Sequence, residues 1–248
     1  MASFGVEAIR YFSHARAAGY GADDLSYTFN RANGFDSKLR AHGHQRQFYW
    51  ANTDCWETDI RDSDGGGDDR SYVDNVDLFW IETHGNHTAD GQALMIYDTP
   101  QTGWFTYSGQ WQLGENWNAE WVMAFSCKTV DRGNVGGLWN IFAGMHIFCG
   151  AWDSMYDGST TDECGEDVAD NLVHGHTVSH AWHDGVSDWW VDNHPITVCV
   201  GDAATWNNGN IQWDRSHLNA DHLWGHGNVN ADLPPSRQAC ILYRWTEG

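Results

Sequence analysis

Two apolar runs in this chain each end in a side chain that can do covalent chemistry. Residues 76–83 lead into His84-Gly85, and residues 121–126 lead into Cys127. A cysteine attacks as its thiolate, and a neighbouring imidazole can take the thiol proton and return it to a leaving group. The pattern therefore predicts Cys127 as a nucleophile and His84 as its acid/base partner in acyl transfer.

Backbone groups beside this pair are expected to complete the site. Gly85 carries no side chain to keep a substrate away, so its N–H can help hold an oxyanion. The N–H of Cys127 is the natural second donor. The residues expected to border the substrate cleft are Trp80, Glu82, Ser126, Trp152 and Asp153.

The elements that position these residues read as an α/β protein. Buried apolar strands that alternate with helical segments predict a mostly parallel sheet, in which sites form beyond the carboxyl ends of strands. The expected strands cover residues 5–12, 47–51, 76–83, 94–97, 121–126, 145–152, 196–200 and 239–243. The expected helices cover residues 24–42, 135–143, 163–173 and 177–190, with Gly34 as a possible break in the first.

Composition favours one folded domain over residues 1–248, with tryptophan-rich insertions at about 87–118 and 203–236. Hydrophobic residues make up 41% of the chain, which argues against disorder. Sixteen tryptophans are an excess that indicates either loop anchors or an aromatic cleft. Neither a secretory signal nor an apolar run of about 18 residues is visible, so a cytoplasmic protein without a membrane partner is expected.

The charge and the cysteines exclude several functions. The net charge is −21 and the only lysines are Lys38 and Lys128, so binding to nucleic acid is not expected. The six cysteines are widely spaced without a Cys-x-x-Cys pair, which argues against a zinc ribbon. Cys149 and Cys199 read as small buried hydrophobes.

The order of the segments resembles the clan CD cysteine peptidases, the group of caspases, legumains, gingipains, clostripain and separase. The block ending in His84-Gly85 is followed by one ending in Ser126-Cys127, and residues 144–153, 167–185 and 196–202 resemble the later strand, helix and closing strand of these proteins. The resemblance covers roughly residues 70–205. The nearest likeness is to an uncharacterised bacterial family of caspase-like domains.

This resemblance implies a three-layer caspase-like sandwich, with helices on both faces of a mostly parallel sheet. It implies a hydrolase of the thiol peptidase type with His84 and Cys127 as its dyad, acting on a peptide or amide. Hydrolysis is the default outcome, and transpeptidation or cyclisation is the variant that a water-excluding aromatic wall would favour. The dyad needs no cofactor.

Two metal sites compete with the dyad. His176, His180 and His183 fall at i, i+4 and i+7 on one helical face, a spacing that suits zinc, and a metal-dependent enzyme built on them is an alternative. The acidic loop is the candidate for calcium through Asp62, Asp64, Asp68 and Asp69, although an EF-hand register fails there. A third alternative is a caspase-like domain that binds a ligand without catalysis.

Overall fold

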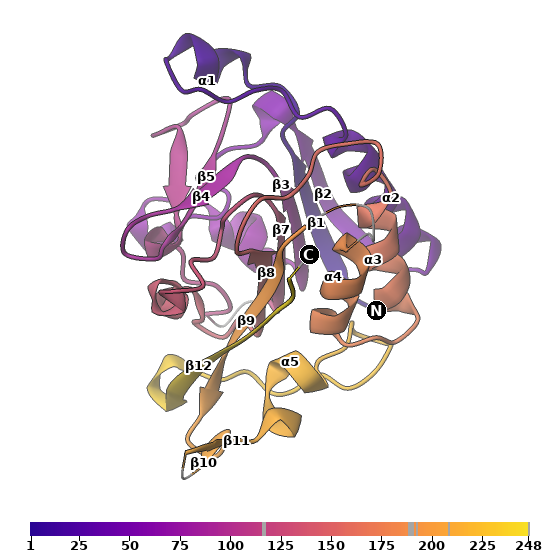
Figure 1. The fold of residues 1–248 in the computed structure, drawn as a ribbon, viewed down its shortest axis with the longest axis vertical. Coiled ribbons are helices and arrows are strands. Elements are labelled where there is room, and N and C mark those ends of the chain that lie inside the picture. Colours follow the sequence, from indigo (N-terminus) through magenta and orange to yellow (C-terminus); the bar gives the residue numbers. More distant parts are fainter. Residues whose placement is uncertain (116–117, 188–190, 192, 208, 248) are drawn as a thin grey trace.

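The computed structural model describes residues 1–115, 118–187, 191, 193–207 and 209–247. A seven-stranded sheet runs through the middle of the molecule in the order β12-β9-β8-β7-β3-β1-β2 (Figure 1). Its strands are β1 (Ser3–Ala8), β2 (Gln45–Ala51), β3 (Leu78–Glu82), β7 (Trp121–Phe125), β8 (Ile147–Ala151), β9 (Pro195–Asp202) and β12 (Gln238–Trp245). Strands β2, β1, β3, β7 and β8 are parallel to one another, whereas β9 is antiparallel to β8 and β12 is antiparallel to β9.

Helices cover one face of this sheet. These are α2 (Thr28–Ala41), α3 (Cys164–Val173), α4 (Val178–Val186) and α5 (His217–Ala220). Phe35 and Leu39 of α2 pack with Trp80 of β3 and Trp182 of α4 in one buried cluster. Burial of such large apolar side chains is the main force that fixes the helices on the sheet.

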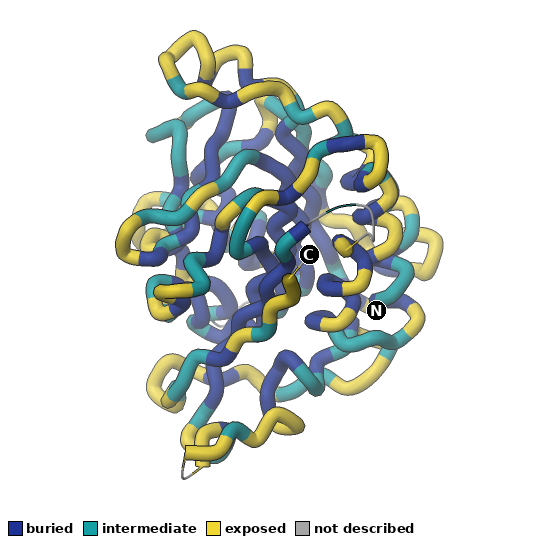
Figure 2. Tube along the Cα trace, in the orientation of Figure 1, coloured by how far each residue is buried: buried dark blue, intermediate teal, exposed yellow. Residues whose placement is uncertain are grey.

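The other face carries a smaller layer. It consists of the helix α1 (Ser13–Ala17) and the antiparallel sheet of β4 (Gly85–His87), β5 (Ala93–Ile96) and β6 (Phe105–Tyr107). A 3₁₀ helix at Val135–Ile141 packs through Val135, Leu138 and Ile141 into a second buried cluster on this face, which also contains Ala15 and Met95. The inner strands β1, β3, β7, β8 and β9 are buried, whereas the edge strands β2 and β12 are partly exposed. Exposure otherwise concentrates in the outer loops (Figure 2). The predicted three-layer α/β architecture is confirmed.

The remaining elements are short. The hairpin of β10 (Trp206–Asn207) and β11 (Asn210–Ile211) lies near α5, at the end of the molecule away from α1 (Figure 1). Further 3₁₀ helices span Asn52–Asp54, Ser63–Gly65, Asp69–Ser71, Val73–Asn75, Ser108–Gln110, Trp213–Arg215 and Pro235–Arg237. None of the helices in the described part of the chain has the length and apolar character to cross a membrane.

Several expected boundaries shift for identifiable reasons. Gly34 does not interrupt α2. A Cβ at this position would lie only 3.0 Å from the Glu166 Cβ of α3, so glycine allows the two helices to pack closely together. The expected helix over 135–143 is a 3₁₀ helix, in keeping with the low helix propensity of Gly136 and Gly137. The helix expected over 177–190 ends at Val186, and residues 188–190 lie outside the described residues.

Candidate active site

The ends of β3 and β7 bring the predicted catalytic residues to the same edge of the sheet. These parallel strands are neighbours, and Glu82 pairs with Phe125 at their last register position. His84 and Cys127 each follow two residues beyond this pair. Neighbouring strands lie about 4.8 Å apart, so both residues leave the sheet from adjacent positions.

Direct contact between the two segments is made at Gly85. A Cβ placed on this glycine would lie 2.3 Å from the Ser126 Oγ and 2.7 Å from the Cys127 carbonyl oxygen. Any residue with a side chain would therefore push the segments apart. Glycine is required here by close approach and not by its backbone dihedral angles.

The His84 ring is held from two sides. Its Nε2 lies 2.7 Å from the carbonyl oxygen of Asp23, and its ring centroid lies 4.8 Å from that of Phe12. Because a carbonyl only accepts, Nε2 carries the proton and Nδ1 is left with its lone pair. In the neutral ring, Nδ1 is thus the nitrogen that can accept a proton, while Nε2 is fixed by the Asp23 carbonyl.

The loop after Cys127 is also fixed. The Cys127 sulfur is half-buried and accepts a hydrogen bond from the Met155 N–H at 3.3 Å. Lys128 then adopts a left-handed conformation with φ of 54°, and its N–H donates to the Asp153 carbonyl at 2.9 Å. The carbonyl oxygen of Lys128 lies 3.0 Å from the Nδ1 of His87. These contacts turn the chain sharply beyond the sulfur.

A cleft of about 410 Å³ opens beside the histidine. Its lining is mixed: Tyr20, Ala22, Leu94, Ile96 and Phe105 lie beside His84, Asn86 and three glycines. The ring of Tyr20 meets that of Phe105 edge-on at 4.9 Å. The aromatic and aliphatic part of this lining can hold an apolar group beside His84.

Two residues expected in the cleft face the opposite way. Trp80 is fully buried and stacks on Phe35 with ring centroids 4.5 Å apart. Glu82 is also fully buried and accepts hydrogen bonds from the Trp80 indole and from the Arg31 guanidinium, both at 2.9 Å. Alternate residues of a strand point to opposite faces, so residues 80 and 82 share the helix-covered side. Burial raises the pKa of Glu82 to about 7, although Arg31 opposes this rise.

The other expected cleft residues have mixed positions. Ser126 is buried, with its Oγ against Gly85 and without a hydrogen-bond partner among the described residues. Trp152 and Asp153 are partly exposed. The Trp152 ring is flanked by the guanidinium of Arg132 at 4.2 Å, and Asp153 pairs with the Lys128 ammonium at 3.5 Å.

Arg31 is a supporting residue that sequence reasoning missed. It is buried and joins Glu82 on one side to Asp157 on the other, with a nitrogen–oxygen distance of 3.0 Å to the latter. Asp157 belongs to the loop that also carries Met155, so this ion-pair network connects α2, β3 and the segment against the Cys127 sulfur. The available sequence signal was the position of Arg31 on the same helical face as Phe35 and Leu39.

The histidine stripe is only partly brought together. His176 and His180 stack at 5.0 Å and can share a ligand with Asp184. His183 was wrongly expected with them. It is buried and contacts the hydroxyl groups of Thr197 and Thr246, because its position on α4 faces the sheet.

The acidic loop also differs from its expected ligand set. Asp62 and Asp64 approach Glu115, which the sequence did not suggest. Asp69 is instead buried and accepts hydrogen bonds from the backbone and hydroxyl of Ser63, and Asp68 is exposed and lies outside the cluster. The 3₁₀ helices at Ser63–Gly65 and Asp69–Ser71 bend this loop, and its four aspartates do not converge on one point.

The fold and the strand-end residues define an α/β domain with a histidine and a cysteine at adjacent strand ends. A family model described as "Domain of unknown function (DUF6345)" matches residues 6–247, and the chain belongs to this family. No curated protein sequence matches the chain. Among solved structures, the chain is similar to the Drosophila initiator caspase Dronc, with 11% identity and a TM-score of 0.41 over 74% of this chain and 70% of that chain.

Proposed function

We propose that this protein is a cysteine-dependent peptidase or amide acyl-transferase in which Cys127 is the nucleophile and His84 the acid/base. The observation that carries the proposal is the contact between the two strand ends. Gly85 lies against Ser126 and the Cys127 carbonyl, and the dyad residues follow a registered strand pair. A thiol and an imidazole therefore lie at one edge of the sheet, which supports the proposal.

The reaction follows from these groups. The Nδ1 of His84 takes the Cys127 thiol proton, and the thiolate forms a bond to the substrate carbonyl carbon. The N–H groups of Gly85 and Cys127 stabilise the oxyanion. The carbon–nitrogen bond then breaks, and His84 gives the proton to the departing amine. Water cleaves the resulting thioester in hydrolysis, whereas a second amine cleaves it in transpeptidation or cyclisation.

The surroundings favour a substrate with an apolar or aromatic side chain near the cleaved bond. The cleft beside His84 offers Tyr20, Leu94 and Phe105 as its contacts. The net charge of −21 repels strongly acidic peptides. We therefore expect neutral or basic peptides with a hydrophobic residue in this cleft.

The test is cleavage of a fluorogenic peptide library near neutral pH, with products identified by mass spectrometry. Cys127→Ala and His84→Ala are expected to lose cleavage by about 10³-fold or more. Cys240→Ala is the matched control, because Cys240 is also partly buried but lies on the distant edge strand β12. Full activity in Cys127→Ala would refute the proposal.

Alkylation separates catalysis from mere binding. An activated thiolate at Cys127 should react with iodoacetamide faster than a simple thiol near neutral pH. A rate no faster than that of glutathione, together with no cleavage, would favour a non-catalytic ligand-binding domain.

A metal-dependent enzyme on the histidine stripe has weaker support. His183 points into the core, so the stripe keeps two of its three predicted ligands, joined by Asp184. Activity that is lost on chelation but kept in Cys127→Ala would favour this alternative.

A further inference from the structure

A second group of side chains lies at the opposite edge of the sheet from the dyad. Glu120 and His146 directly precede β7 and β8, so they lie at the amino ends of these parallel strands. Their backbones are joined by a hydrogen bond of 2.8 Å from the His146 N–H to the Glu120 carbonyl. Asp221 and Asp232, from the segment after α5, approach the same histidine.

One nitrogen of His146 is committed to a carboxylate. Its Nδ1 lies 2.6 Å from Asp221 Oδ2, and both residues are fully buried. The same carboxylate also accepts hydrogen bonds from the Asn230 N–H and from the His217 ring, each at 2.9 Å. Nδ1 therefore donates to Asp221, and a metal ion that binds at Nε2 displaces the proton that this nitrogen otherwise holds toward the carboxylates. Histidines that bind metal ions commonly donate their other ring N–H to a carboxylate, which holds the ring in the orientation needed for binding.

The other nitrogen points at two more carboxylates. His146 Nε2 lies 3.0 Å from Glu120 Oε2 and 3.5 Å from Asp232 Oδ1. The buried Nε2 and Oε2 atoms do not meet the geometry of a hydrogen bond with any partner in the described residues. Ligand atoms about 2.1 Å from a tetrahedral zinc ion lie about 3.4 Å from one another, close to both of these separations.

We propose that His146 Nε2, Glu120 Oε2 and Asp232 Oδ1 bind one divalent transition-metal ion of the zinc class. These three ligand atoms all lie within 4.8 Å of one another. One nitrogen and two carboxylate oxygens are donors that zinc accepts, and a dication balances carboxylates that the histidines alone leave in excess. Neither the dyad nor the peptidase proposal is needed for this site.

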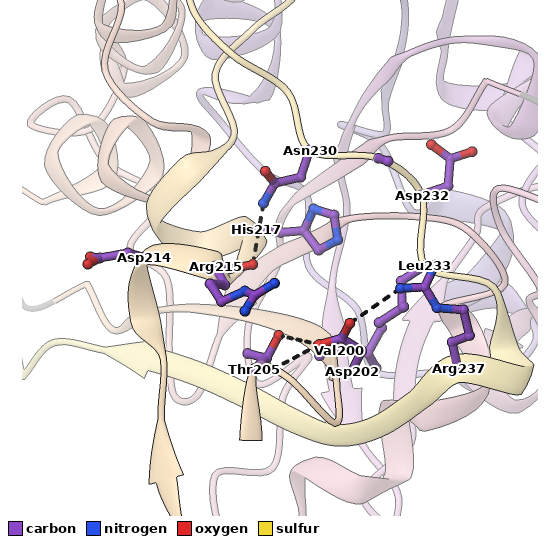
Figure 3. Close-up of a pocket in the computed structure, with 12 residues that line it drawn as sticks. Val200, Asp202, Thr205, Asp214, Arg215, His217, Asn230, Asp232, Leu233 and Arg237 are labelled. Carbon is purple, nitrogen blue, oxygen red and sulfur yellow. Dashed lines mark hydrogen bonds and ion pairs between the residues drawn. The ribbon is translucent and has the colours of Figure 1, made fainter. Parts of the chain in front are cut away.

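The position of the site gives the ion an open side. Asp232 is 64% exposed. A cleft of about 340 Å³ borders the cluster through His217 and Asp232 (Figure 3). A fourth ligand from solvent can enter there, and the ion ties the segment that carries Asp232 to the amino ends of β7 and β8.

The experiment uses the full chain stripped with a chelator and titrated with Co²⁺ and then Zn²⁺, followed by visible absorption and calorimetry. It is done in a His176→Ala/His180→Ala background, so that the exposed cluster on α4 does not contribute. We expect one equivalent of Co²⁺ with d–d bands of a protein site, displaced by Zn²⁺. We also expect a rise in melting temperature with metal.

Variants decide where the ion binds. Asp232→Asn, at an exposed position that does not threaten folding, and Glu120→Gln should each weaken Zn²⁺ binding by about tenfold or more. Asp214→Asn is the control, because Asp214 lines the same cleft outside the cluster and should leave affinity unchanged. Absence of binding in the background protein, or unchanged affinity in Asp232→Asn, overturns the proposal and leaves a metal-free ionic network.

Discussion

Replacement of Gly85 by alanine tests the contact on which the active-site geometry depends. The new Cβ would lie 2.7 Å from the Cys127 carbonyl oxygen, about 0.7 Å closer than the 3.4 Å at which ordinary contact begins. It would also lie 2.3 Å from the Ser126 Oγ, which is buried and has little room to move. The backbone of one strand end must therefore shift.

The magnitude follows from the cost of overpacking. Extra atoms in a packed region destabilise by about 1–3 kcal/mol. For a chain of this size each kcal/mol lowers the melting temperature by about 2–4 °C, so a decrease of about 2–12 °C is expected. A displacement approaching 1 Å at the dyad should also lower peptide cleavage by about 10²-fold.

The assay combines calorimetry with the rate of Cys127 alkylation, read on its own peptide by mass spectrometry. Gly136→Ala is the matched control, because its Cβ would meet nothing closer than 3.9 Å. The reasoning is refuted if Gly85→Ala matches Gly136→Ala in melting temperature, alkylation and cleavage.

Three further predictions concern stability. Arg31→Met leaves the buried Glu82 carboxyl without its cation and should lower the free energy of unfolding in urea by about 3–5 kcal/mol. Adding Glu82→Gln should restore part of this stability. A double variant no more stable than Arg31→Met would contradict the ion-pair network. Thr177→Ala removes the hydroxyl group that caps α4 by accepting a hydrogen bond from the His180 N–H. It should lower the free energy of unfolding by about 1 kcal/mol in the same measurement. An unchanged unfolding midpoint would show that this cap does not stabilise the protein. Burial raises the pKa of Asp74 from 3.8 to about 7, so the native state holds a proton that the unfolded chain releases; this contribution is complete below about pH 4 and is lost as the pH rises to about 7. Unfolding followed across this range should show Asp74→Asn with a flatter pH dependence, and an unchanged slope would count against the shift.

The sequence predicted the architecture because the evidence for it is local. Continuous apolar runs around Ile81, Ala124 and Phe148 identify strands buried on both faces, and the spacing of Val168 and Leu172 identifies a helix. It also predicted that His84 and Cys127 leave the sheet at its carboxyl edge, since both follow such runs. The proposed roles of the two residues remain predictions for the variants described above.

The sequence by itself determined the strands of the main sheet, the longer helices and the pair of strand-end residues, because hydrophobic periodicity and helix-breaking residues are properties of neighbouring positions. Only the tertiary structure decided which side of the sheet each side chain points to and which residues it contacts. In the folded protein, the side chains of Trp80, Glu82 and His183 are buried in the core. The tertiary structure also placed the Asp23 carbonyl on His84 and gathered Glu120, His146 and Asp232 from separate segments. These contacts join residues that are far apart in the chain. They depend on long-range packing, which a local sequence pattern does not encode.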